Sequence, residues 1–281
     1  MVKEKIMRVV FLLAACMAIL SVLLICVFLF ANGLPAFQKI GVLNFLTGTK
    51  WAPGNDIYGI APMILGTIYV TAGAILVGVP IGIMTAIFMA EFCPAWLYKL
   101  LKPAIQLLSG IPSIIYGFFG MVLLVPLSGK LFGGSGKSIL TASVLLGIMI
   151  LPTIISISES AIRAVPGSYY EGARSLGATH EEAVFTAVVP ASWSGILAGV
   201  VLGIGRAVGE TMAVIMICGN QAALPESIFS GVRTLTANIV LEMGYAADLH
   251  REALIATAVV LFVFILLINF LFSALKRREK A

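Results

Sequence analysis

An arginine and a glutamate, Arg206 and Glu210, interrupt a long apolar stretch that reads GIGRAVGETMAV over residues 203–214. A guanidinium is always protonated, and its planar fork can give two parallel hydrogen bonds to an oxyanion. A charge at the centre of a bilayer costs about 2.5–3.5 kcal/mol, so an ionisable residue there indicates a functional site. We interpret Arg206 as an oxyanion-binding group on a substrate path, and Glu210 as the partner that orients and moderates it.

The helix periodicity supports this interpretation. In one continuous helix of about 100° per residue, Arg206 and Glu210 share a face with Gly199 and Gly203, and Gly195 extends the row of glycines. Small residues at this spacing let a neighbouring helix approach closely. We therefore predict that this face meets a helix or a cavity instead of lipid. A structural alternative, in which the two charges only neutralise each other and fix the packing, remains open.

A second polar stretch, SGIPSIIYG, occupies residues 109–117. Ser109, Ser113 and Tyr116 can line the same path, and Pro112 frees a backbone carbonyl and permits a bend. Because serine and glycine also pack membrane helices against each other, helix packing is an equal alternative for this stretch.

The elements that position these residues follow from the composition. The chain has 281 residues, of which 60% are hydrophobic and 11% charged, and its mean hydropathy is +1.08. Soluble domains carry about 25% charged residues. Apolar segments of helical period and of membrane-spanning length are expected near residues 7–30, 60–90, 105–127, 139–161, 191–218 and 253–275. We predict an all-α polytopic bundle with about six transmembrane helices.

The positive charges predict the orientation of this bundle. Most Lys and Arg residues lie in segments 91–104 and 162–190 and near the two termini, so the positive-inside rule places these segments and both termini in the cytoplasm. The first apolar segment is longer than the core of a signal peptide, which predicts an uncleaved span. The net charge of +5 is explained by this topology. Neither a basic face nor an aromatic platform for nucleic acid is visible.

Several other features predict structural elements and no catalytic or metal site. Residues 91–104 predict an amphipathic interfacial helix or a plain connector. The stretch GGSGKS at 133–138 lacks the first glycine of a Walker loop, which favours a flexible turn and no ATP hydrolysis in this chain. The four cysteines and two histidines show no metal or disulfide pattern, and no catalytic cluster is visible. Glu159 and Arg163, four residues apart, predict an ordinary interfacial ion pair.

The long inner loop predicts a helical hairpin. One helix is expected over 167–176, ending at Gly177, and a second over 179–188, where Thr179 and Glu182 form a capping box. Pro190 is expected to separate this hairpin from the fifth span. Such a hairpin is suited to dock into a groove on a soluble partner. A surface hairpin without a partner is an equal alternative.

The same loop, EGARSLGATHEEAVFTAVVP, resembles the EAA loop of ABC importer permeases. Glu171, Ala173, Gly177 and Pro190 match the family pattern in register, whereas Gly172 replaces the first alanine of EAA. The resemblance implies a type I ABC importer permease (MetI-like) fold. It also implies a coupling loop that is held by a separate cytoplasmic ATPase, which binds the ATP and Mg²⁺; no cofactor is expected in this chain.

Further resemblance covers nearly the whole chain. The stretches NFLTGTKWAP (44–53), YGIAPMILGT (58–67), SGIPSIIYG and GRAVGETMAV (205–214) are similar to the PstC family of phosphate-importer permeases. The resemblance implies a first helix and outer loop over 1–57 and a permease domain over 58–281, with residues 168–190 as the coupling loop.

The resemblance also implies partners and a substrate. They are a PstA-type second permease subunit, a PstB-type ATPase dimer, a PstS-type extracytoplasmic binding protein, and phosphate. Another oxyanion substrate, such as molybdate, sulfate or phosphonate, is an alternative. A stand-alone secondary transporter, in which Arg206 and Glu210 relay protons, is a further alternative.

Overall fold

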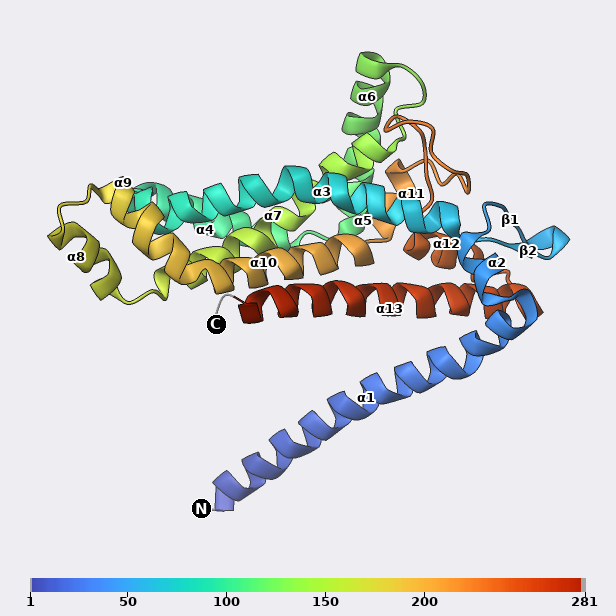
Figure 1. The fold of residues 1–281 in the computed structure, drawn as a ribbon, viewed down its shortest axis with the longest axis horizontal. Helices are drawn as coiled ribbons and strands as arrows, with labels where there is room; N and C mark the ends of the chain where they lie inside the picture. Colours follow the sequence, from blue (N-terminus) through green and yellow to red (C-terminus); the bar gives the residue numbers. More distant parts are fainter. Residues whose placement is uncertain (1, 279–281) are drawn as a thin grey trace.

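The computed structural model describes residues 2–278, which form a bundle made almost entirely of helices (Figure 1). Among these residues, 6 helical segments are long and apolar enough to cross a membrane: Ile6–Ile40, Ala61–Phe92, Ser113–Phe132, Ile139–Arg163, His180–Gly209 and Asp248–Leu271. The predicted all-α multi-pass membrane fold is confirmed.

The α-helices in chain order are α1 (Val2–Ile40), α2 (Val42–Thr47), α3 (Ala61–Ile87), α4 (Ala95–Gly110), α5 (Ser113–Phe119), α6 (Val125–Phe132), α7 (Ile139–Arg163), α8 (Gly167–Ser175), α9 (His180–Ala183), α10 (Val189–Gly209), α11 (Met212–Ile217), α12 (Leu235–Glu242) and α13 (Asp248–Arg278). Three π-helical turns continue helices: η2 (Phe88–Phe92), η3 (Gly120–Leu124) and η4 (Val184–Val188). A small antiparallel hairpin joins β1 (Trp51–Ala52) to β2 (Ile57–Tyr58) through the 3-10 turn η1 (Pro53–Asn55).

Helix α7 is the centre of the bundle. Helices α3 and α10 pack along it, and its side chains Leu145, Met149, Ile150 and Ile154 are buried in the main core. Helices α8 and α9 lie at one end of the long axis, which we call the hairpin end. The β-hairpin, α2 and α12 lie at the other, which we call the loop end (Figure 1).

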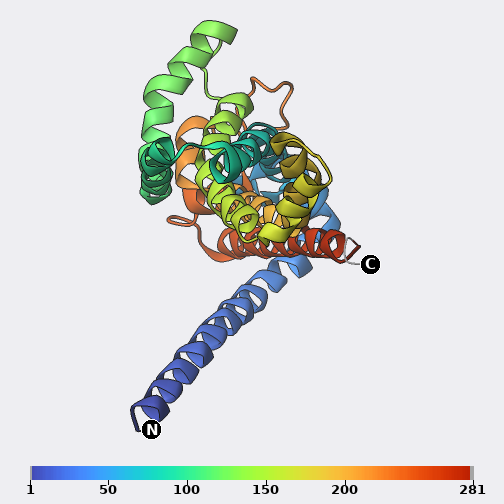
Figure 2. The same ribbon diagram turned by 90° about the vertical axis from the view of Figure 1, so that its left-hand side faces the viewer.

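Helix α1 packs on α13 near the loop end (Figure 1) and diverges from the bundle toward its N-terminus (Figure 2). Its last turns pack on α13, where a Cβ on Gly33 would lie 2.8 Å from Val259 Cγ2. Residues 6–25 of α1 are exposed within the chain. Its apolar side chains are therefore free to face lipid or a membrane partner.

The third span begins later than the sequence predicts. A single helix was expected over 105–127, but the chain becomes extended at Ile111 and Pro112, so Ile105 belongs to α4 and the span starts at Ser113. A proline disfavours helical backbone angles at the residue before it, here Ile111, so α4 ends at Gly110. The segment that was expected to form an interfacial helix over 91–104 is helical from Ala95 onward.

The expected separation at Pro190 is wrong. The backbone is helical from His180 to Gly209, so the second hairpin helix runs directly into the fifth span. Before the proline the helix widens into the π-turn η4, in which the Val189 amide donates to the Val184 carbonyl. This local widening gives room for a proline ring that would clash with the carbonyl four residues earlier in a regular helix.

Candidate functional site

Arg206 and Glu210 lie on opposite sides of a break in the helix. The expected continuous helix over 191–218 is wrong, because α10 ends at Gly209 and α11 begins at Met212. Glu210 itself has extended backbone angles, φ −70° and ψ 131°. The two side chains therefore do not share the helical face that the sequence predicts.

Arg206 occupies the last turn of α10 and points toward α7. Its Nη1 atom donates a hydrogen bond to Thr153 Oγ1 at 3.3 Å, and the arginine is partly buried. Within the described residues this is its one side-chain hydrogen bond, although a guanidinium has five N–H donors. The negative end of the α10 dipole gives the charge further compensation. Within the part of the chain that the structure describes, most of the guanidinium donors thus have no protein acceptor, and such a fork could bind an oxyanion.

Glu210 is compensated by the next helix instead of by Arg206. Its Oε1 atom accepts hydrogen bonds from the backbone amides of Thr211 at 3.2 Å and Ala213 at 3.4 Å. Its carbonyl oxygen accepts from Thr236 Oγ1 of α12 at 3.0 Å. Among the described residues, no ion pair within 4.0 Å joins Arg206 to Glu210. Glu210 holds the helix break in place, and each charge is stabilised by the nearer helix end.

A second break, at Ile111 and Pro112, lies beside the first. Tyr116 in α5 donates a hydrogen bond across it to the Leu108 carbonyl at 2.8 Å. Helix α5 packs on α11, where a Cβ on Gly117 would lie 2.9 Å from Ala213 Cα. Two broken helices therefore meet near Arg206, an arrangement that membrane transporters use around substrates.

The other two residues of the predicted path are more open. Ser109 is exposed on α4, and Ser113 is partly buried at the start of α5. They lie on the two sides of the second break. Tyr116 is the buried residue of this group.

The glycine row of α10 faces α7. A Cβ added to Gly195, Gly199 or Gly203 would lie 2.3 Å from Ala161 Cβ, 3.1 Å from Ser158 Oγ and 2.8 Å from Ile154 Cγ1, respectively. Such distances require the neighbouring atoms to move. The row brings the backbones of α10 and α7 together, and this places Arg206 beside Thr153. Thr153 was not singled out from the sequence, although it follows Pro152 inside a span, where a polar residue is a usable signal.

The hairpin at the other end has the caps that the sequence predicts. Gly177 has φ +93°, and the Ala178 amide donates to the Ala173 carbonyl at 3.2 Å, which forms a Schellman motif at the end of α8. The Thr179 and Glu182 capping box is present. None of the residues of α8 is buried. Leu176 at the turn is 91% exposed.

The residues of the predicted coupling loop are open to a partner. Glu171, Gly172, Gly177 and Pro190 are exposed, and Ala173 is partly buried. The base of the hairpin is fixed by a hydrogen bond of 3.0 Å between Tyr170 Oη and His180 Nδ1.

A buried carboxylate at the loop end was missed in the sequence. Glu242 Oε2 accepts from Trp51 Nε1 at 2.8 Å and lies 2.9 Å from His250 Nε2, while Oε1 accepts from Arg233 at 2.5 Å. The Glu242 side chain is 9% exposed. The cluster ties together the β-hairpin, α12 and the start of α13. No short sequence motif joins these residues, which lie in separate segments.

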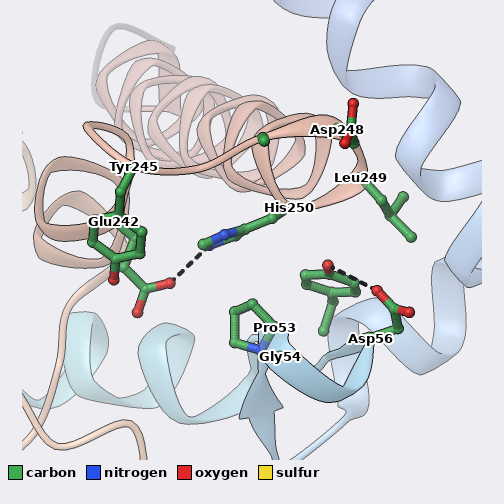
Figure 3. A pocket seen from close by; sticks show the side chains of 10 residues that line it. Pro53, Gly54, Asp56, Glu242, Tyr245, Asp248, Leu249 and His250 are labelled. Atoms are coloured by element: carbon green, nitrogen blue, oxygen red, sulfur yellow. Dashed lines mark hydrogen bonds and ion pairs between the residues drawn. The ribbon is translucent and has the colours of Figure 1, made fainter.

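An open pocket of about 520 Å³ lies beside this cluster (Figure 3). Asp56, Tyr58, Tyr245 and Asp248 line it together with Glu242 and His250. Burial raises the pKa of Tyr58, and the neighbouring Asp56 carboxylate raises it further.

Comparison with known proteins gives matches over most of the chain. Residues 78–281 match the family model described as "Binding-protein-dependent transport system inner membrane component". The chain is 42% identical over 263 residues to a probable ABC transporter permease protein, YqgH, of Bacillus subtilis, covering 90% of this chain and 85% of the relative. It is 38% identical to the phosphate transport system permease protein PstC of Mesorhizobium japonicum, covering 89% and 81%.

Solved structures share the fold. A chain of the bacterial alginate ABC transporter has a TM-score of 0.64 at 16% identity, covering 95% of this chain and 94% of that one. A chain of the inward-facing MetNI methionine ABC transporter has a TM-score of 0.58 at 20% identity, covering 79% and 94%.

Proposed function

Because the chain belongs to the family of binding-protein-dependent transport system inner membrane components, we propose that it is the permease subunit of an ATP-driven importer of inorganic phosphate. The relatives that carry a phosphate name include PstC proteins of Mesorhizobium japonicum, at 38% identity, and Haemophilus influenzae, also at 38%. Their similarity extends over most of the chain.

The observation that best supports this function is the Arg206 fork beside two helix breaks. A phosphate oxyanion matches a planar guanidinium through two parallel hydrogen bonds. A transporter must also release its substrate, so a site with one strong donor group and few others suits transient binding. Arg206 is the main charge of the path, and Glu210 keeps the break open by holding the first amides of α11. Ser109, Ser113 and Tyr116 complete the path.

The hairpin of α8 and α9 couples this path to ATP hydrolysis in a separate subunit. An exposed helix with an apolar tip at Leu176 fits a groove on a separate ATPase, a PstB-type dimer that binds ATP and Mg²⁺. When ATP closes that dimer, α8 moves with it, and the continuous helix from His180 to Gly209 carries the motion toward Arg206. This chain itself binds no nucleotide and catalyses no reaction.

The remaining assembly follows the same proposal. Both termini and the hairpin face the cytoplasm, and the loop end faces outward. A PstA-type permease supplies the other half of the path, and a PstS-type binding protein delivers phosphate to the loop end.

Reconstitution tests the proposal. The chain is co-expressed with its neighbouring subunits, placed in vesicles, and given radiolabelled phosphate, the binding protein and ATP. We expect ATP-dependent phosphate uptake that requires all subunits. Uptake by this chain alone, driven by a proton gradient, would contradict the proposal in favour of a secondary transporter. Preference for molybdate or sulfate would contradict the assignment of phosphate as the substrate.

Deletion of the hairpin tests the coupling separately. Removal of residues 168–188 is expected to abolish ATP-dependent uptake while phosphate still binds to the external protein. Persistent ATP-coupled uptake would place the coupling elsewhere in the assembly.

A further inference from the structure

A buried carboxylate lies at the root of the hairpin. Glu159, one turn before the end of α7, has a side chain that is only 1% exposed. Its Oε1 atom accepts hydrogen bonds from Tyr98 Oη at 2.7 Å and Arg163 Nε at 3.0 Å, and Oε2 accepts from Lys102 Nζ at 2.5 Å. The predicted pair with Arg163 therefore forms, but it belongs to a larger cluster in which α4 supplies two of the donors.

Arg163 extends the cluster to a third element. Its Nη2 atom donates to the Met89 carbonyl of η2 at 2.7 Å, and its guanidinium carbon lies 4.6 Å from the centre of the Tyr98 ring. Arg163 is the last residue of α7, and α8 begins at Gly167. The cluster thus joins α4, α7 and the end of the second span at the point where the hairpin leaves the membrane helices.

Stability alone is a weak reason for such a cluster. Burying an ion pair costs desolvation energy, and an apolar replacement of similar volume is often equally stable. A carboxylate with three donors instead fixes one arrangement of the elements that it joins. Here it fixes α4 to α7, although these helices are separated in sequence by two further helices.

Helix α4 leads directly from this cluster to the substrate path. Tyr98 and Lys102 lie in its first half, and its last turn ends at the break before Pro112. Across that break, Tyr116 bonds to the Leu108 carbonyl. A displacement of the first turns of α4 therefore reaches the residues beside Arg206 through one short helix and one hydrogen bond.

We propose that Glu159 is a positioning residue for coupling, which locks α4 to α7 so that movement of the hairpin displaces α4 and opens or closes the path at the second helix break. The inference rests on the proposed function, since it requires an ATPase that moves α8. It adds a second route, through α4, to the direct route through α10.

Two variants test the contact between α4 and α7, one at the carboxylate of α7 and one at the cation of α4. Glu159→Gln keeps a side chain of the same size without the charge, and Lys102→Met removes the cation that α4 contributes. In vesicles with the complete transporter, we expect both variants to reduce the phosphate transported per ATP hydrolysed by at least about fivefold, the low end of measured coupling between linked sites. A purely structural role would reduce the amount of assembled transporter and leave this ratio unchanged.

The control is Glu252→Gln. Glu252 also pairs with a lysine, Lys39, at 2.7 Å, but this pair lies at the loop end and its lysine is largely exposed. We expect the wild-type ratio in this variant. An unchanged ratio in both Glu159→Gln and Lys102→Met would overturn the inference.

Hydrogen exchange tests the lock without reference to phosphate. In the wild-type complex, a non-hydrolysable ATP analogue is expected to change amide exchange in both 167–188 and 95–110. In Glu159→Gln, we expect the change in 167–188 to remain and the change in 95–110 to disappear. A response of 95–110 that matches wild type would overturn the inference. Failure of the wild-type complex to transport phosphate would contradict the proposed substrate. The comparison of amide exchange between wild type and Glu159→Gln would still test the role of Glu159.

Discussion

Glu242 at the loop end and Arg206 at the end of α10 are both charged and largely removed from water, but they are compensated differently. Glu242 contacts Trp51, Arg233 and His250, so both of its oxygens are paired. Arg206 donates to one hydroxyl, that of Thr153, at 3.3 Å. A carboxylate with a full set of donors is committed to the protein. Most of the Arg206 donors have no acceptor among the described residues, so this guanidinium is not committed to the protein in the same way.

This difference separates a structural charge from a functional one. Buried polar groups in stable proteins are hydrogen-bonded, because an unpaired one costs free energy. Arg206 carries that cost only as long as no ligand or partner pairs with it, and the end of α10 reduces the cost further. We therefore expect variants at Glu242 to lower stability and variants at Arg206 to lower transport.

The largest expected effect is the loss of stability in Glu242→Ala. This change leaves the partly buried Arg233 without its counter-charge, and breaking a buried pair in this way costs up to about 3–5 kcal/mol. Thermal unfolding of the purified chain in detergent should show a clearly lower midpoint. The matched control is Glu252→Ala, which removes a more exposed ion pair and is expected to cost less than about 1 kcal/mol. Equal losses in the two variants would mean that burial does not distinguish these sites.

Arg206→Gln should lower transport and leave stability nearly unchanged. We expect phosphate uptake by the assembled transporter to fall about tenfold to one-hundredfold, the range for losing charged hydrogen bonds of about 1.5–3 kcal/mol. The thermal midpoint should change little, because the protein makes one long hydrogen bond to this side chain. Arg206→Lys keeps the charge but loses the fork, and intermediate uptake is expected. Uptake at the wild-type rate in Arg206→Gln would remove Arg206 from the path.

Gly203→Ala tests how Arg206 is positioned. The added methyl group would lie 2.8 Å from Ile154 Cγ1 of α7, and overpacking of this kind costs about 1–3 kcal/mol. It should also push α10 away from Thr153 and lower uptake. Gly205→Ala is the control, since a Cβ there meets nothing within 4 Å. We expect this control to match or exceed wild-type stability, because alanine favours a helix more than glycine does. A loss as large in Gly205→Ala as in Gly203→Ala would contradict the close helix contact.

Periodicity and composition were sufficient to predict the six spans, the hairpin and its caps, because these depend on local sequence. The breaks within spans were harder to predict. Pro112 ends a helix, whereas Pro190 is absorbed by a π-turn, and the residue type is the same in both cases. At Glu210 no proline or turn motif marks the break. The pattern of an apolar run with a single carboxylate therefore predicts one continuous helix.

The charge clusters depend on tertiary contacts. Glu159 and Arg163 are close in sequence, so their pair was predictable, but Tyr98 and Lys102 come from a different helix. The partners of Glu242 lie in three separate segments. One sequence carries no signal that brings such residues together, and only the folded chain shows which charges are paired.

The smallest expected effect concerns Arg206 and Glu210 themselves. If each charge is stabilised by its own helix end, the stability losses in Arg206→Gln and Glu210→Gln should add in the double variant, with an interaction energy below about 0.5 kcal/mol. Denaturant unfolding of the four proteins in micelles measures this. An interaction energy above about 1 kcal/mol would mean that the two side chains pair directly, as a continuous helix requires. In that case Arg206 would be partly committed to the protein, as Glu242 is, and an incoming oxyanion would have to compete with Glu210 for the fork.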